Sequence, residues 1–231
     1  MKIHRFIVGF VKEGKKLVVV NKDFLHQANR VLRFKIGENI ILCDNNFNDY
    51  LVEIIELNKK QCVGKLLEIK KTPDKGIKKE ITLYLPLIKK ENFELSVQKA
   101  VELGVSKIVP LIAERSIKNN LNLKRLEAII KEASEQSGRG KVAVFESPIK
   151  FEVVVKSLSS KDQNLFFDFS GSLIKNIKLK DKINIFIGPE GGWTENEVKI
   201  AKDNGLEVAK LNGLVLRAET AVITACFGVL Q

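Results

Sequence analysis

The pattern of apolar residues changes near residue 72, and this change constrains the fold more than any other feature of the chain. Before it, four short runs are β-branched or alternate in polarity and are separated by Gly, Asn and Asp, at 16–20, 39–44, 50–57 and 61–69. Such runs are typical of a small β-barrel. After it, strand-like runs alternate with amphipathic segments, as in a parallel α/β sheet. We therefore predict an α/β protein, α+β overall, with a barrel domain over 1–72 and an α/β domain over 73–231.

Helical spacing of apolar residues predicts a helix in each part of the chain. In the barrel half this helix covers 22–32. In the α/β half one helix has Phe93, Val97, Ala100 and Val101 on its apolar face and ends at Gly104, and another begins near Asn122. A further helix begins after Thr194, which forms a capping box with Glu197. The α/β strands are predicted at 81–87, 107–113, 142–145, 164–169, 183–187 and 207–211.

Two segments have compositions that set them apart from these elements. Residues 70–80 place Pro73 and Gly76 among lysines and are the best linker candidate. Residues 218–230 form a helical segment that is apolar nearly all round. Such a helix is expected to be buried or to lie in an interface.

Charge points toward a polyanionic partner. The net charge is +11, and residues 1–72 hold 14 Lys and Arg against 8 Asp and Glu, which concentrates the excess in the barrel half. Nucleic acid is the natural partner for such a surface, although only seven of the 39 basic residues are Arg, so a solvated lysine-rich surface is an alternative.

Other classes of protein are disfavoured by the sequence. No apolar run approaches the length of a membrane span, and the N-terminus lacks the apolar segment of a signal peptide. Three widely spaced cysteines match no zinc pattern and indicate reduced thiols. We expect a cytoplasmic protein with no metal and no membrane association.

The loop at 187–192 follows a predicted strand and precedes a helix, where α/β sheets bind ligands. Its order, Gly188-Pro189-Glu190-Gly191-Gly192, is neither of the common phosphate-binding patterns. A carboxylate beside phosphate is unfavourable, whereas hydroxyls or a positive charge, as in a ribose or a sulfonium, suit it. A tight connection without a ligand explains the composition equally well.

A second loop, at 211–220, also leaves a strand and enters the last helix. Glu219 suits the helix dipole there, and this is its simpler interpretation. Arg217 is harder to explain structurally, because a cation is unfavourable at a helix N-terminus, so it indicates a functional site. A third loop follows Gly138, a plain helix cap, and presents Arg139. Both histidines lie in the barrel half, which excludes a His-based triad in the other half.

Taken in order, these stretches resemble a known family. The matching segments are HRF (4–6), VLRFKIGE (31–38), the run 93–116, EQSGR (135–139), IGPEGGWTENEV (187–198) and LRAETA (216–221). Together they are similar to the ribosomal RNA small subunit methyltransferase E family, in the SPOUT class of RNA methyltransferases. The chain departs from the family's usual Leu-Gly-x-Arg at Leu211-Asn212-Gly213-Leu214.

The resemblance implies a fold and a reaction. It implies an N-terminal PUA-like β-barrel and a C-terminal SPOUT domain with a trefoil knot, a rare exception to the rule against knots. It also implies a homodimer that binds S-adenosyl-L-methionine in the knot and releases S-adenosyl-L-homocysteine. The implied partner is ribosomal RNA or the small ribosomal subunit, methylated at N3 of one uridine. Another RNA as substrate, such as transfer RNA, and RNA binding without catalysis are the alternatives.

Site residues follow from the resemblance. Arg217 is expected to stabilise the uridine anion and so to act in catalysis. The expected phosphate contacts are Arg5, Arg33, Arg115 and Arg139. The residues expected to hold the methyl donor, largely through backbone groups, are Ile187, Gly188, Pro189, Glu190, Gly191, Gly192, Leu211, Asn212, Gly213, Leu216, Ala218, Thr220 and Ala221.

Overall fold

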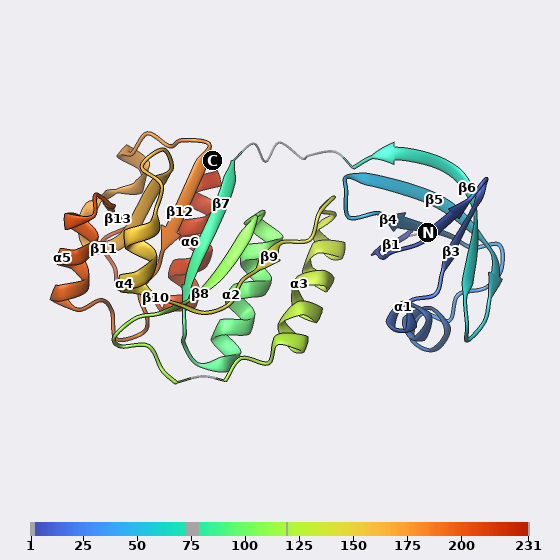
Figure 1. The fold of residues 1–231 in the computed structure, drawn as a ribbon, viewed down its shortest axis with the longest axis horizontal. Coiled ribbons are helices and arrows are strands. Elements are labelled where there is room, and N and C mark those ends of the chain that lie inside the picture. Colours follow the sequence, from blue (N-terminus) through green and yellow to red (C-terminus); the bar gives the residue numbers. More distant parts are fainter. Residues whose placement is uncertain (1–2, 73–78, 119, 231) are drawn as a thin grey trace. The chain divides into compact units, whose positions relative to one another are not determined.

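A computed structural model describes residues 3–72, 79–118 and 120–230, which divide into two compact units (Figure 1). The first unit holds the described residues up to Thr72 together with Ser134–Val142. The second holds the other described residues, from Lys79 to Ala133 and from Ala143 onward. Most of the predicted linker, residues 73–78, lies outside the described residues.

The first unit is built from strands, as predicted. Its sheet order is β1-β4-β5-β6-β3-β2, and only β1 and β4 pair in parallel. The predicted helix is confirmed as α1 with a π-helical turn after it. Its elements are β1 (His4–Ile7), β2 (Val11–Glu13), β3 (Lys16–Val19), α1 (Lys22–His26), the π-helical turn Gln27–Val31, β4 (Asn39–Cys43), β5 (Asn48–Leu57) and β6 (Cys62–Lys71).

Two strands of this sheet escaped prediction because neither has a readable pattern. β1 is four residues long, and all three residues of β2 are exposed. The apolar side of the sheet encloses a core that includes Phe6, Leu17, Phe24, Ile40 and Val52. An edge-to-face contact between the Phe6 and Phe24 rings, whose centroids lie 5.0 Å apart, stabilises this core.

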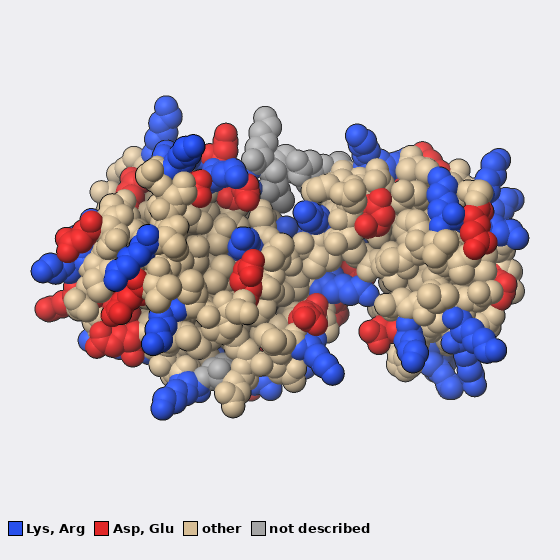
Figure 2. Space-filling model, in the orientation of Figure 1, with Lys and Arg blue, Asp and Glu red and all other residues tan. Residues whose placement is uncertain are grey.

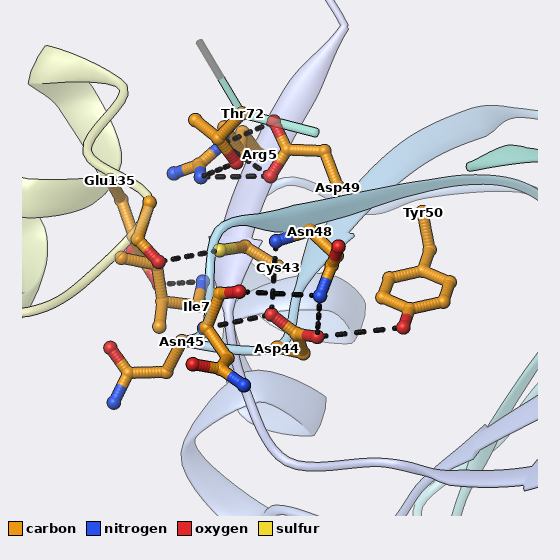
Figure 3. Close-up of polar contacts among 12 residues, drawn as sticks. Arg5, Ile7, Cys43, Asp44, Asn45, Asn48, Asp49, Tyr50, Thr72 and Glu135 are labelled. Atoms are coloured by element: carbon orange, nitrogen blue, oxygen red, sulfur yellow. Dashed lines mark hydrogen bonds and ion pairs between the residues drawn. The ribbon is translucent and has the colours of Figure 1, made fainter. Parts of the chain in front are cut away.

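Residues 134–142 are part of the first unit because their backbone and side chains bond to its strands (Figure 3). The Ile7 N–H donates to Glu135 Oε1 at 2.8 Å, and the Phe47 N–H donates to the Gly140 carbonyl at 3.1 Å. Gly138, with φ +74°, ends the preceding helix as predicted. There the Arg139 N–H bonds back to the Ser134 carbonyl at 2.9 Å.

The second unit is an α/β sheet in which every strand pairing is parallel (Figure 1). The order is β10-β8-β7-β12-β11-β13, with β9 beside β8. The predicted α/β class is confirmed. The elements are β7 (Glu80–Pro86), α2 (Lys90–Leu103), β8 (Lys107–Ile112), α3 (Leu123–Ser137), β9 (Val144–Phe145), β10 (Ile149–Lys150), α4 (Phe151–Val154), β11 (Gln163–Leu173), β12 (Lys182–Phe186), α5 (Glu195–Asp203), β13 (Glu207–Lys210) and α6 (Ala218–Leu230), with 3-10 turns at Val155–Ser157 and Ile174–Asn176.

In the second unit β10 was not predicted, and β9 and β11 differ most from their predicted bounds. β9 is shorter than the predicted 142–145, because residues up to Val142 belong to the first unit. β11 extends past the predicted end at 169, and its pairing with β13 shifts register between Phe167 and Ser172. The strand therefore bends toward its carboxyl end, and the alternation of apolar residues does not predict this part of it.

Helix α6 is buried along one face, as its composition indicated. Val222, Ala225, Cys226 and Val229 are fully buried, and α6 packs on α2. Phe227 lies on another face and is 52% exposed. Within this single chain, α6 therefore buries one face in the core and exposes the apolar side chain of Phe227 on another.

Candidate functional site

A cavity of about 580 Å³ opens at the carboxyl ends of β12 and β13 and beside Phe167–Phe169, in the middle of β11. Carboxyl ends of parallel strands meet at one edge of a sheet, which is where such sheets bind ligands. The two loops singled out from the sequence form much of its wall. The lining residues are Lys89, Asn92, Phe167, Asp168, Phe169, Ile187, Gly188, Pro189, Glu190, Gly192, Trp193, Lys210, Leu211, Asn212, Leu214, Val215, Leu216, Arg217, Ala218, Glu219 and Ala221.

The first loop is held in place by Trp193. Its indole N–H donates to the Phe167 carbonyl at 3.0 Å, and its ring stacks on Phe166 with centroids 4.5 Å apart. Gly188 lies under the same indole, where a Cβ atom would come within 3.0 Å of Trp193 Nε1. Gly192 takes φ +68° and donates to the Pro189 carbonyl at 2.8 Å, closing a turn that a side chain would strain.

The acid inside the loop has a defined partner. Glu190 Oε1 accepts a hydrogen bond from the Lys89 backbone N–H at 3.2 Å, which joins the loop to the start of α2. Arg115 joins the same loop from another side, since its Nη1 donates to the Gly191 carbonyl at 2.8 Å. The loop is thus fixed by hydrogen bonds to Lys89 and Arg115, which both lie outside it.

Helix α5 is anchored directly after this loop. The predicted capping box is confirmed, with the Thr194 N–H donating to Glu197 Oε2 at 2.9 Å and the Glu197 N–H donating to Thr194 Oγ1 at 3.2 Å. Glu197 is 3% exposed, and its Oε1 accepts from the Glu114 N–H at 2.8 Å. The far end of the loop is therefore rigid.

The second loop turns where the sequence departs from the family pattern. Asn212 Oδ1 accepts from the Leu214 N–H at 3.0 Å, so the asparagine side chain makes the turn. Leu214 and Val215 then stand 72% and 84% exposed. Arg217 is exposed at the cavity wall, and its guanidinium has no hydrogen bond or ion pair with any residue that the structure describes.

Most of the residues expected to hold a ligand do line this cavity. Gly191, Gly213 and Thr220 do not. Sequence reasoning missed the contributions of β11 and of the start of α2, namely Lys89, Asn92 and Phe167–Phe169. Lys89 directly precedes α2, whereas Phe167–Phe169 lie in the middle of β11, and such positions identify a site only when the order of the strands is known.

The four arginines expected to contact phosphate differ in their surroundings. Arg5 is 11% exposed and pairs with Asp49, with Nη2 to Oδ1 at 2.8 Å (Figure 3). Arg33 is exposed, with φ +54°. Arg115 is exposed and bonds the Gly191 carbonyl. Arg139 is partly buried, which lowers the pKa of its guanidinium, and its Nε donates to the Lys141 carbonyl at 3.2 Å.

Cationic side chains cover both units, mixed with acids (Figure 2). Among residues 3–72, 79–118 and 120–230, no group of three or more His, Cys, Asp or Glu is placed to hold a metal. No helix in those ranges is both long and apolar enough to cross a membrane. All three cysteines are buried and free.

Comparison with known proteins agrees with this arrangement. Residues 75–230 match the model of an RNA methyltransferase domain, and residues 30–67 match that of an RNA methyltransferase PUA domain. The PUA-like character predicted for the N-terminal part is thereby confirmed. The two matches place the chain in the class of RNA methyltransferases.

Relatives over the full length narrow the class. The ribosomal RNA small subunit methyltransferase E of Rickettsia conorii is 30% identical over 97% of this chain and 94% of its own, and that of Synechocystis is 30% identical over 96% of this chain and 75% of its own. The Neisseria gonorrhoeae enzyme of the same name, solved bound to S-adenosyl methionine, superposes with a TM-score of 0.88 at 28% identity over 97% of this chain and 95% of its own. The chain belongs to the ribosomal RNA small subunit methyltransferase E family.

Proposed function

We propose that this protein transfers a methyl group from S-adenosyl-L-methionine to N3 of one uridine in small-subunit ribosomal RNA. Family membership supports RNA methylation, and the cavity between the two loops supports a site for the donor. The N3 position and the choice of uridine rest on the resemblance between the loop sequences and this family. A protein that methylates ribosomal RNA is expected in the cytoplasm.

The residues around the cavity fit the donor. Gly192, with φ +68° and no described atom within 4 Å of its Cβ position, lets backbone approach a ligand closely, and backbone N–H and C=O groups suit adenine recognition. The cavity wall holds the carboxylates of Asp168 and Glu190, which suit an ammonium group and ribose hydroxyls. When bound, the donor supplies a methyl group already activated by the sulfonium.

Arg217 is the group we assign to catalysis. Methyl transfer to N3 requires that the ring nitrogen lose its proton, and a nearby cation stabilises the resulting charge. The guanidinium lines the cavity and is unpaired among the described residues, so it is available for a substrate oxygen. Alignment of the nucleophile with the methyl group contributes to the rate as well.

We assign RNA binding to the PUA-like part, residues 1–72, and catalysis to residues 73–231. Arg33 and Arg115 are the exposed candidates for phosphate contacts, while Arg5 contributes mainly through its pair with Asp49. Arg139 is assigned a phosphate contact beside its bond to the Lys141 carbonyl.

A trefoil knot around the donor site and a homodimer complete the proposal. The exposed apolar side chains of Leu214, Val215 and Phe227, at the second loop and on α6, support a subunit interface beside the cavity. Covering them would remove apolar surface that a single chain leaves in water.

The test is methylation by the purified protein. Small ribosomal subunits and free ribosomal RNA from cells that lack the gene are incubated with methyl-labelled donor, and nucleosides are separated by mass spectrometry. The proposal expects label in 3-methyluridine. Label only in transfer RNA would favour a different substrate, and absence of label together with retained RNA binding would favour a non-catalytic protein.

A further inference from the structure

Of the three carboxylates that line the cavity, two already have hydrogen-bond donors. Asp168 Oδ1 accepts from the Ser170 N–H at 2.9 Å and from Ser170 Oγ at 2.7 Å. Glu190 Oε1 accepts from the Lys89 N–H at 3.2 Å. These two acids therefore have structural tasks that explain their positions.

Glu219 is the third carboxylate, and its position is unexplained by any such contact. Its Oε2 atom is buried from solvent and has no hydrogen-bond partner among the residues that the structure describes. An unsatisfied buried acceptor costs about 1–3 kcal/mol, and more when it is charged. Because Glu219 lines the cavity, a donor group that forms a hydrogen bond with this oxygen would remove that cost.

Glu219 also has a cation near it in the sequence, Arg217, with which it forms no ion pair. Arg217 lies two residues earlier, just before α6 begins at Ala218. Side chains two positions apart on a helix do not face each other, and no ion pair joins these two. One wall of the cavity thus offers a separate proton acceptor and a separate cation. The acceptor can take up a ring proton, and the cation can stabilise the anion that results.

We propose that Glu219 accepts the N3 proton of the uridine, an inference that rests on the proposed methyl transfer to N3. The N3–H bond breaks and its proton passes to the Glu219 carboxylate. The freed electron pair on N3 forms the new bond to the methyl carbon, and sulfur keeps the pair of the carbon–sulfur bond that breaks. Carboxylate and sulfonium both end neutral, so charge balances without another reactant.

The test compares Glu219→Gln, which keeps the shape and removes the charge, with the purified wild-type protein. The readouts are the single-turnover methylation rate as a function of pH and the affinity for S-adenosyl-L-homocysteine by calorimetry. We expect affinity within about twofold of wild type and a rate lower by about 10²- to 10⁴-fold. The variant's rate should keep rising with pH where the wild-type rate levels off, because solvent then removes the proton.

Glu195→Gln is the matched control. Glu195 is also an acid in the first turn of a helix, but it is exposed and lies outside the cavity. If Glu219 served only the helix dipole, both variants would keep the wild-type rate and pH profile, and the proposal would be overturned. A rate lost through weaker donor binding and restored at saturating donor would overturn it as well.

A second variant keeps the proposal testable if Glu219→Gln folds poorly. Glu219→Ala opens space for a small carboxylate, and added formate should raise its rate in a concentration-dependent way. No rescue in a folded Glu219→Ala protein would contradict the role. Failure of the proposed function is read separately, because wild-type protein would then yield no 3-methyluridine under any condition.

Discussion

The indole N–H of Trp193 donates a 3.0 Å hydrogen bond to the carbonyl oxygen of Phe167, while the same ring lies against Gly188. This contact joins the loop after β12 to the middle of β11. The cavity wall is therefore set by packing within the chain before any ligand arrives. A preformed wall lowers the ordering cost of binding.

Replacement of Trp193 by Phe tests this contact. The Phe167 carbonyl would lose its donor inside the protein, so the free energy of unfolding should fall by about 1–3 kcal/mol. S-adenosyl-L-homocysteine should also bind more weakly, because the loop loses its anchor. Urea denaturation and calorimetry measure the two effects. Wild-type stability with wild-type affinity would show that the bond does not hold the wall.

A methyl group at Gly188 should disturb the same wall by crowding it. The added Cβ would lie 3.0 Å from Trp193 Nε1, so Gly188→Ala forces the ring to move, and overpacking of this kind costs about 1–3 kcal/mol. Gly213→Ala is the control, because no described atom lies within 4 Å of its Cβ position. Thermal or urea unfolding should separate the two variants. Equal stabilities would argue against close packing at Gly188.

Arg5 and Arg33 should give opposite results when replaced by alanine. Arg5 makes three hydrogen bonds to Asp49 in a partly buried pair, so Arg5→Ala should lower the free energy of unfolding by about 1.5–3 kcal/mol. Arg33 is exposed, so Arg33→Ala should leave stability within about 0.5 kcal/mol. Its effect should appear in RNA affinity, with a salt slope smaller by about 1. RNA affinity unaffected by Arg33→Ala would remove it from the interface.

Because of its buried thiols, the protein's free energy of unfolding should depend on pH in the alkaline range. Burial raises the pKa of Cys226 to about 12 and that of Cys62 to about 11, from 9.0. Because each thiol has a higher pKa in the folded protein than in the unfolded chain, its contribution to stability is complete below pH 9. That contribution is lost as the pH rises toward the pKa of the folded state. Stability against urea should therefore fall above pH 9, and less steeply in Cys226→Ala. Parallel pH curves for both proteins would contradict this assignment.

Features that depend on neighbouring residues could be predicted from the sequence. The capping box of Thr194 and Glu197 and the helix end at Gly138 were predicted because each needs only a few adjacent residues. The Arg5–Asp49 pair and the bond from Ile7 to Glu135 were not, because they join residues 44 and 128 positions apart. No pattern of neighbouring residues predicts contacts between positions so far apart in the sequence.

The candidate site divides in the same way. Both glycine-containing loops were found because each follows a strand and precedes a helix. Lys89 and Phe167 were missed because their place at the cavity depends on the strand order β7-β12-β11-β13, which is not the order along the chain. The unpaired oxygen of Glu219 also needed three-dimensional packing, since the helix dipole alone accounts for an acid there.

The methylation profile of small-subunit ribosomal RNA from cells with and without this gene tests the central claim most directly. Mass spectrometry of the digested RNA should find one 3-methyluridine in cells that carry the gene and none in cells that lack it. The modification should return with the wild-type gene and not with the Arg217→Ala variant. An identical uridine profile in both cell types would contradict the assignment of this reaction to the protein.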